Sequence, residues 1–159
     1  MLTTLLGTRY VLLICGLVCL LRKKVRKSQM SNSLRVLRGV VMGEFSFRLV
    51  DDVVRANKAL VREGLVMQTW GNASAIDQAR SRVFIKSSGV PFEHLKPEDI
   101  SQVDLEGNAH TPFRPSVDTP THLEIYKGFD SVGGVVHTHS HYATVFAQAK
   151  MAIPCLGTT

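Results

Sequence analysis

The first 41 residues contain no acidic residue, although they contain eight lysines and arginines. Residues 42–159 hold the other eleven bases together with all thirteen acids, which leaves that part with a net charge of −2. The positive charge of the chain therefore belongs to an N-terminal segment, and the rest has no basic footprint for a phosphate backbone. This charge distribution argues against a nucleic-acid-binding protein.

Cysteine is also scarce. Cys15, Cys19 and Cys155 form no CxxC pair and are odd in number, which excludes a disulfide framework and a cysteine zinc site. A reducing compartment fits best, and we expect a cytoplasmic protein. The sequence contains no P-loop, no GxGxxG, no serine in a nucleophile elbow and no cysteine placed to act with a histidine. These absences exclude the common nucleotide-binding loops and the serine and cysteine hydrolases.

The apolar run near the N-terminus is shorter than the about 20 residues that a membrane-spanning helix needs. Tyr10–Leu21 is twelve residues long and is followed at once by Arg-Lys-Lys-Val-Arg-Lys, which does not resemble a signal-peptide cleavage site. If this run inserted, its positive flank would keep the domain on the cytosolic side. We predict a basic apolar leader over 1–41, either a membrane anchor or an extension before a start at Met30 or Met42, and one domain over 42–159.

Hydrophobic spacing and turn residues predict an α/β fold with a mixed sheet. We expect helices over 47–63, ended by Gly64, and over 141–150, capped by Ser140, and a further helix that Thr119 caps with Pro120 in first position. The expected strands are 65–70, before a turn at Gly71-Asn72, and then 82–86, 101–105 and 132–139. Helices and strands alternate without a strict βαβ rhythm.

Three of the six histidines stand at alternate positions in the stretch 135–142, VVHTHSHY. On a strand His137 and His139 point to the same face, and imidazole nitrogen is a good zinc ligand. The preceding Gly-Gly-Val-Val run buries the approach of the strand and leaves the polar pair at its exit. His141 is expected to turn away into the following helix. The pair alone leaves both a metal site and a solvated strand end open.

Other polar residues have an ordinary and a functional interpretation. Asp118 precedes a helix, where capping is the usual role of an aspartate, but it could also complete a ligand set with the two histidines. His122 is expected at the surface or behind such a site, and His94 and His110 receive no role. Ser87-Ser88-Gly89, after Lys86, could bind an anion through N–H groups, hydroxyls and the ammonium, although such turns are common.

Five motifs follow one another along the chain: TWGNAS (69–74), IKSSGV (85–90), PSVDTPTH (115–122), GGVVHTHSHYAT (133–144) and IPCLGTT (153–159). In this order and spacing they resemble the class II aldolase/adducin-type family, and within it most closely the L-ribulose-5-phosphate 4-epimerases. The resemblance extends from about Phe45 to the last residue. Five motifs with consistent spacing are far more specific than one HxH pair.

The resemblance implies a three-layer α/β/α class II aldolase-like domain with a largely antiparallel sheet, and a catalytic divalent metal, usually Zn²⁺. It implies Asp118, His137 and His139 as metal ligands. It also implies contacts to the substrate phosphate or nearby hydroxyls from residues at the ends of the other motifs: Asn72, Lys86, Ser88, Gly89 and Ser116. A small-molecule sugar phosphate is the implied partner, and a homo-oligomer, a tetramer in the family, is the implied assembly.

The implied reaction converts L-ribulose 5-phosphate to D-xylulose 5-phosphate in pentose (arabinose) catabolism, by breaking and remaking a carbon–carbon bond with a metal as Lewis acid. Asp rather than Glu at position 118 favours this epimerase, because the aldolases of the family carry a catalytic Glu there. A class II sugar-phosphate aldolase, which releases the aldehyde, is the alternative. A non-catalytic adducin-like module is a third interpretation.

Two positions depart from the family pattern. Val117 stands where the epimerases usually carry a second serine, so one hydroxyl contact to phosphate is absent. The family continues beyond the position of Thr159, and the resemblance implies that a third metal-binding histidine and the acid/base residues lie in that further part. We therefore expect the chain to correspond to the N-terminal two-thirds of the family domain, without the family's acid/base groups.

Overall fold

The computed structural model describes residues 9–14, 17–21 and 38–154, and the side chains of residues 47–154. Its longest element is a helix, α1, over Arg38–Arg62. Its buried residues recur at helical spacing, as Leu49, Val53 and Leu60 illustrate. After the helix, Gly64 has a φ of +67°, which allows Leu65 N–H to donate to Leu60 O at 2.9 Å. The predicted helix is confirmed, and it begins nine residues earlier than the sequence pattern indicated.

Six strands form one sheet in the order β2-β1-β6-β3-β4-β5. Only β1 and β6 pair in parallel, and every other neighbouring pair is antiparallel. The mixed, largely antiparallel sheet is thus confirmed. The bounds are Arg9–Ile14 for β1, Leu17–Leu21 for β2, Asn72–Ile76 for β3, Val83–Lys86 for β4, Ile100–Val103 for β5 and Val132–Thr138 for β6.

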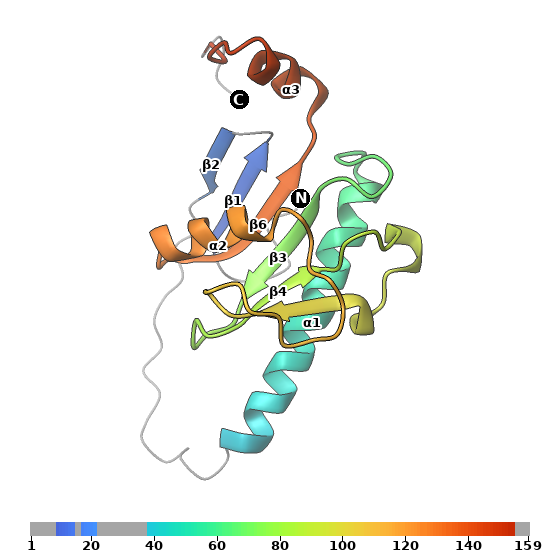
Figure 1. Cartoon of the computed structure of the whole chain (residues 1–159), viewed down its shortest axis with the longest axis vertical. Helices are drawn as coiled ribbons and strands as arrows, with labels where there is room; N and C mark the ends of the chain where they lie inside the picture. The colour runs from blue at the N-terminus through green and yellow to red at the C-terminus, as the bar shows by residue number, and fades with distance from the viewer. Residues whose placement is uncertain (1–8, 15–16, 22–37, 155–159) are drawn as a thin grey trace.

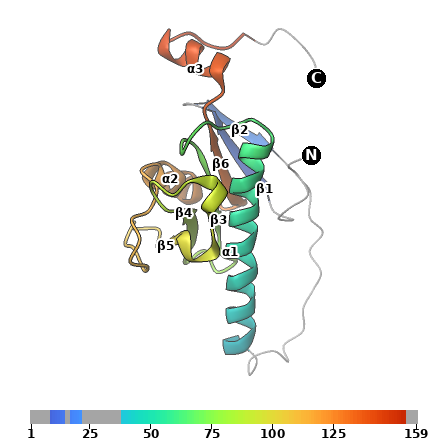
Figure 2. The same cartoon turned by 90° about the vertical axis from the view of Figure 1, so that its right-hand side faces the viewer.

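Helices cover both faces of the sheet, as Figures 1 and 2 show. On one face α1 packs through Val53 and its neighbours against Ala75 and Phe84. On the other face α2, over Thr119–Gly128, packs through Leu123 and Tyr126. Because both faces are covered, every residue of β3 and β4 is buried. The three-layer α/β/α arrangement is confirmed.

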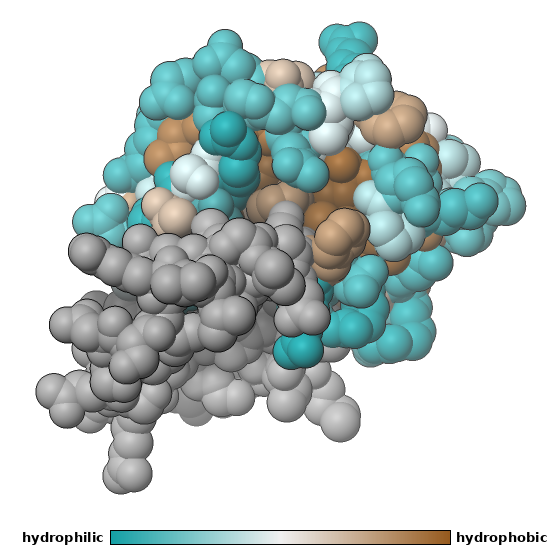
Figure 3. Space-filling view, turned by 90° about the horizontal axis from the view of Figure 1, so that it is seen from below, coloured by the Kyte–Doolittle hydropathy of each residue, from teal (hydrophilic) through white to brown (hydrophobic). Residues whose placement is uncertain are grey.

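Three short helices complete the described part. Phe92–His94 and Pro97–Asp99 are 3₁₀ helices between β4 and β5. The last helix, α3, covers His141–Gln148, contains no buried residue and extends past the end of the sheet (Figure 1). On the face seen from below, apolar residues group toward the centre with hydrophilic residues around them (Figure 3).

The predicted strand over 65–70 is wrong. Gln68 and Gly71 have φ values of +53° and +79°, which interrupt an extended backbone, and the segment forms turns. The strand begins after Gly71 instead, at Asn72, where the chain pairs with β6. The apolar residues of 65–70 suggested a strand, but only Val66 among them is buried.

Only part of the predicted leader over 1–41 lies among the described residues. Two segments of it, β1 and β2, lie in the sheet, with β1 along β6 and β2 along β1. This pairing gives the backbone groups on that side of β6 their hydrogen-bond partners. The predicted boundary after residue 41 falls inside α1. In the part of the chain that the structure describes, no helix is both long and apolar enough to cross a membrane.

Arg80 ties the β3–β4 turn to the end of α2. Asp77 organises this turn by accepting hydrogen bonds from Ser81 N–H and Arg82 N–H. The guanidinium of Arg80 then donates to three carbonyls beyond the turn, those of Tyr126, Asp130 and Val132. Since Tyr126 lies in α2 and Val132 begins β6, Arg80 fixes the position of the helix relative to the strand.

Replacing Arg80 with methionine keeps the aliphatic stem and removes all three hydrogen bonds. We expect Arg80→Met to lower the free energy of unfolding by about 2 kcal/mol, because hydrogen bonds from charged groups are the stronger ones and carbonyls lose their partner. Arg82→Met is the matched control, since Arg82 donates only to Ser81 O of its own turn. Urea unfolding measures both, and equal midpoints for the two variants would contradict the role of Arg80.

Candidate active site

Two imidazoles lie together at the carboxyl end of β6. His137 is the next-to-last residue of the strand, and His139 follows its last residue, Thr138. Their ring centroids are 4.7 Å apart, which confirms that alternate positions bring both rings to one side. His137 lies on the same face as Val135, the face that α2 covers. His141 begins α3, as predicted, and does not join the pair.

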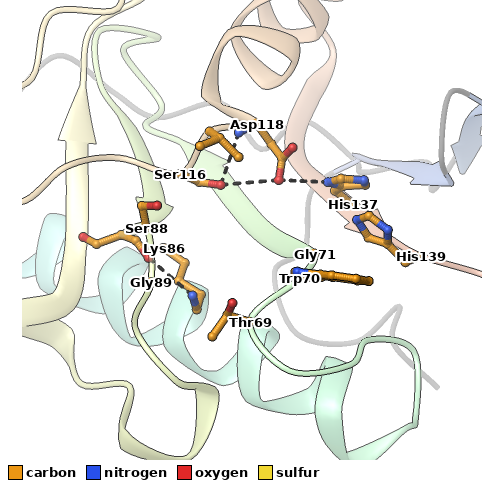
Figure 4. A pocket seen from close by; sticks show the side chains of 12 residues that line it. Thr69, Trp70, Gly71, Lys86, Ser88, Gly89, Ser116, Asp118, His137 and His139 are labelled. Atoms are coloured by element: carbon orange, nitrogen blue, oxygen red, sulfur yellow. Dashed lines mark hydrogen bonds and ion pairs between the residues drawn. The ribbon is translucent and has the colours of Figure 1, made fainter.

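Asp118 meets this pair from the start of α2. It occupies the N-cap position but makes no side-chain capping bond. Its Oδ2 lies 3.0 Å from Nδ1 of His137 instead (Figure 4). Thr119, which was expected to cap, is the first helical residue, and its hydroxyl donates to Ser116 O at 2.6 Å. The capping interpretation is therefore wrong for both residues, and the carboxylate is free to face the histidine.

Asn72 lies behind the carboxylate. Its side-chain NH₂ donates to Asp118 Oδ2 at 2.6 Å and to Ser116 Oγ at 2.9 Å. Asn72 is buried and opposes His137 in the register of β3 and β6. Asn72 therefore contacts two of the predicted site residues, Asp118 and Ser116, but it does not line the pocket.

Electrostatics favour the ionised form of Asp118. The close approach of His137 is the largest cause, and the Asn72 amide adds to it, so that the pKa of Asp118 falls to about 2 although partial burial opposes this. The carboxylate is therefore charged at neutral pH. Nδ1 of His137 lies 3.0 Å from Asp118 Oδ2, but the geometry is not that of a hydrogen bond. This nitrogen therefore has no hydrogen-bond partner among the described residues.

The pocket in front of these groups has a volume of about 320 Å³ (Figure 4). Seven of the eight predicted site residues line it, and Asn72 does not. The lining consists of Thr69, Trp70, Gly71, Lys86, Ser87, Ser88, Gly89, Ser116, Val117, Asp118, His137 and His139. Sequence reasoning gave no role to Thr69 and Trp70. Trp70 stands in the first of the five motifs, but nothing in that motif indicates which way its ring points.

Lys86 supplies a buried cation on the opposite side of the pocket. The side chain ends 4.9 Å from the centroid of the Phe92 ring, and the residue is 2% exposed. Burial lowers the pKa of Lys86, and Asp99 opposes the shift from a distance. Among the residues that the structure describes, no carboxylate lies at ion-pair distance from its Nζ. An anion in the pocket would therefore meet an ammonium group that has no local counter-ion.

The loop after Lys86 and the segment before α2 lie side by side. Ser88 N–H donates to Arg114 O at 2.9 Å, and Ser87 forms an isolated β-bridge with Pro115. The hydroxyl of Ser87 is bonded to Ser101 Oγ, whereas Ser88 is exposed. Gly89 follows with a φ of +76°. This arrangement brings Ser88, Gly89 and Ser116 to the side of the pocket that carries Lys86.

His122 is completely buried, which excludes the surface position and leaves the other expected place, behind the site. Its Nδ1 lies 2.7 Å from Ser74 Oγ, which in turn lies 2.8 Å from Tyr126 OH. Burial lowers the pKa of His122 to about 3, with smaller effects from Asp118 and His137. The imidazole is therefore neutral at pH 7. His94 and His110 are exposed and do not line the pocket.

Three side chains that could donate to a divalent cation lie at one end of the pocket. Asp118 and His137 are in contact, His139 is next to them, and a buried nitrogen of His137 lacks a hydrogen-bond partner. One carboxylate and two imidazoles suit zinc and similar ions. As the side chains stand, no three His, Cys, Asp or Glu residues within the described ranges are arranged to hold one ion. The chemistry of the donors fits a metal.

The sequence profile of the class II aldolase and adducin N-terminal domain family matches residues 51–159. The chain belongs to this family. The expected family resemblance is confirmed at that level. The match covers all five sequence motifs and every residue that lines the pocket.

Solved structures agree with this assignment. An L-fuculose 1-phosphate aldolase is 30% identical, with a TM-score of 0.63 over 67% of this chain and 51% of that one. The l-fuculose-1-phosphate aldolase from Thermus thermophilus is 29% identical, with a TM-score of 0.52 over 62% of this chain and 50% of that one. The enzyme of the same name from Glaciozyma antarctica, at 19% identity, shares the fold, with a TM-score of 0.61 over 80% and 50%. The chain spans about half the length of these proteins.

Burial of neutral His122 predicts a pH dependence of stability. Because the folded pKa of about 3 is far below the unfolded value of about 6.5, the unfolded chain takes up a proton first. The contribution of His122 is complete above about pH 6.5 and is lost as the pH falls toward 3. We expect the free energy of unfolding to fall by about 2 kcal/mol between pH 7 and pH 5.

Urea unfolding at the two pH values measures this loss. His122→Gln, whose amide does not titrate, should lose clearly less stability between them than the wild-type chain. His94→Gln removes an exposed histidine and should behave as wild type. An NMR titration of the wild-type protein that shows His122 protonating near pH 6 would contradict the prediction, even if the glutamine variant failed to fold.

Proposed function

We propose that the pocket binds a phosphorylated sugar and a divalent cation, and that it serves reversible carbon–carbon bond cleavage of the class II aldolase type. One observation carries this proposal. A single cavity has a buried cation with serine and glycine groups on one side, and a carboxylate with two imidazoles on the other. Neither a plain helix cap nor a solvated strand end requires this arrangement.

The side with Lys86 suits the phosphate. Lys86 is buried without a carboxylate at ion-pair distance in the described part of the chain, so an anion there restores charge balance. Exposed Ser88 and the neighbouring Ser116 supply hydroxyls, and the backbone at Gly89 can approach a ligand closely. Val117 offers no hydroxyl at its place. Asn72, which the family resemblance implies as a further contact, donates a hydrogen bond to the hydroxyl of Ser116.

The other side suits the metal. Asp118, His137 and His139 would hold a cation such as Zn²⁺, which supplies Lewis-acid polarisation of a substrate carbonyl when it is bound. The residues of this chain prepare that site. Asn72 directs the Asp118 carboxylate by donating to Oδ2, and the low pKa of Asp118 keeps it charged. Trp70 lies beside His139, with ring centroids 5.7 Å apart.

Two reactions share this chemistry. The names of the L-fuculose 1-phosphate aldolases support cleavage of a ketose phosphate into two fragments. Asp118, where the aldolases of the family carry Glu, favours epimerisation of L-ribulose 5-phosphate to D-xylulose 5-phosphate. Because the chain spans about half the length of the matched structures, the complete activity, a homo-oligomeric assembly and a cytoplasmic location are parts of this proposal.

Metal content and product analysis test the proposal together. After dialysis against Zn²⁺, we expect one ion per chain by elemental analysis, and loss of that ion in Asp118→Ala. With L-ribulose 5-phosphate, D-xylulose 5-phosphate would support the epimerase, whereas glycolaldehyde phosphate without xylulose 5-phosphate would support the aldolase. L-Fuculose 1-phosphate is assayed in parallel. If neither metal nor sugar phosphate binds, the non-catalytic adducin-like interpretation holds.

The phosphate end has its own test. Lys86→Met keeps the aliphatic stem over Phe92 and removes the charge. We expect it to weaken binding of inorganic phosphate by about tenfold or more, because a charge-assisted contact to an anion is lost in a partly dry site. Lys96→Met changes an exposed lysine outside the pocket and should bind as wild type. Calorimetric titration measures both, and equal affinities would place the phosphate elsewhere.

A further inference from the structure

Trp70 is the one tryptophan of the sequence, and it lines the pocket with 54% of its surface exposed. Its ring is tilted by 40° to that of His139, with centroids 5.7 Å apart. Most other groups around it are polar or charged, so the indole provides the largest apolar surface of the pocket. Ligand pockets commonly combine such an aromatic surface with a few polar groups that fix orientation.

The backbone on both sides of Trp70 is held in uncommon conformations. Gln68 has a φ of +53°, which is rare for a residue other than glycine, and Gly71 has a φ of +79°. A Cβ at Gly71 would lie 2.8 Å from His137 O and 2.6 Å from Val66 Cγ1. The turn is thus packed against the end of β6, and Trp70 N–H donates to Met67 O at 3.0 Å. The indole is presented from a fixed support.

The position of the ring connects the two ends of the pocket. In the view of Figure 4 the indole lies between His139 on one side and Thr69 and Lys86 on the other. A ligand that contacts Lys86 with its phosphate and reaches Asp118 and His137 with its carbonyl end fills the pocket that this ring lines. The carbon chain of such a sugar carries C–H groups, which pack well against the apolar face of an aromatic ring.

We propose that Trp70 is a substrate-contacting residue whose indole face packs against the carbon chain of the bound sugar phosphate. This inference rests on the proposed function, since it requires a phosphorylated sugar in the same pocket. Trp70 then contributes to specificity. It adds affinity for a ligand with a carbon chain and none for a free phosphate ion, which contacts only the Lys86 side.

Calorimetric titrations with three probes test this role: inorganic phosphate, L-ribulose 5-phosphate and L-fuculose 1-phosphate. We expect Trp70→Leu to weaken the better-bound sugar phosphate by about tenfold and to change the affinity for inorganic phosphate by less than about twofold. Trp70→Phe retains an aromatic face and should recover most of the loss. Because Trp70 is half exposed, neither variant removes a core residue.

Phe113→Leu is the matched control, since Phe113 is a 44% exposed aromatic residue outside the pocket. It should bind all three probes as the wild-type chain does. Fluorescence of the wild-type protein gives an independent measure, because all indole emission comes from Trp70. Saturating sugar phosphate should shift the emission to shorter wavelength by removing water from the ring, whereas inorganic phosphate should leave it unchanged.

Three outcomes overturn the inference. If Trp70→Leu binds sugar phosphate as tightly as wild type, the indole makes no useful contact, although the proposed function stands. If it loses sugar phosphate and inorganic phosphate equally, the residue only supports the local structure. If the wild-type chain binds inorganic phosphate but neither sugar phosphate, the proposed function fails, and the inference fails with it.

Discussion

The contact between Asp118 and His137 is the constraint on which the rest of the site depends. It joins the start of α2 to the end of β6 at 3.0 Å, so the helix must lie on the face of the sheet to which His137 points. Arg80 fixes the other end of the same helix to the start of the same strand. Helix and strand are thus held together at both ends, and the pocket opens beside the end that carries the charged groups.

The charges of the pocket are held apart by the sheet. Lys86 ends β4, whereas Asp118 and His137 lie at α2 and β6, with β3 between the two strands. A direct ion pair between Lys86 and Asp118 would neutralise both groups and remove the reason for a ligand. Each group has neutral or histidine neighbours instead: the Phe92 ring and Ser87 O for Lys86, and Asn72 and His137 for Asp118. A ligand with an anionic end and a metal-binding end satisfies both groups at once.

Local patterns predicted the elements whose character is set by their own residues. The buried run before His137 predicts β6, and Pro120 predicts the start of α2 within one residue. The failures depend on distant partners. The segment 65–70 is apolar enough for a strand, but the chain pairs with β6 only from Asn72 onward. The choice between a surface position and a buried position for His122 likewise requires a distant residue, Ser74 of β3, which contacts its ring. The role of Asn72 as a support for Asp118 needs the same long-range pairing.

Binding and turnover are separate properties of this fold. Every residue that lines the pocket lies between 69 and 139, within the segment that matches the family. In the proposed function the phosphate, the carbon chain and the metal would each meet a different group of this segment, namely Lys86, Trp70 and Asp118. Their contributions to affinity arise from preorganised groups on β4, β6, α2 and one packed turn.

Proton transfer during bond cleavage requires a further group of suitable pKa near the reacting carbon. Neutral, fully buried His122 cannot serve that purpose, since its nearest polar neighbour, Ser74, lies within the core. Ligand affinity therefore tests the proposed site directly, whereas turnover by the proposed reaction also requires a proton-transfer group.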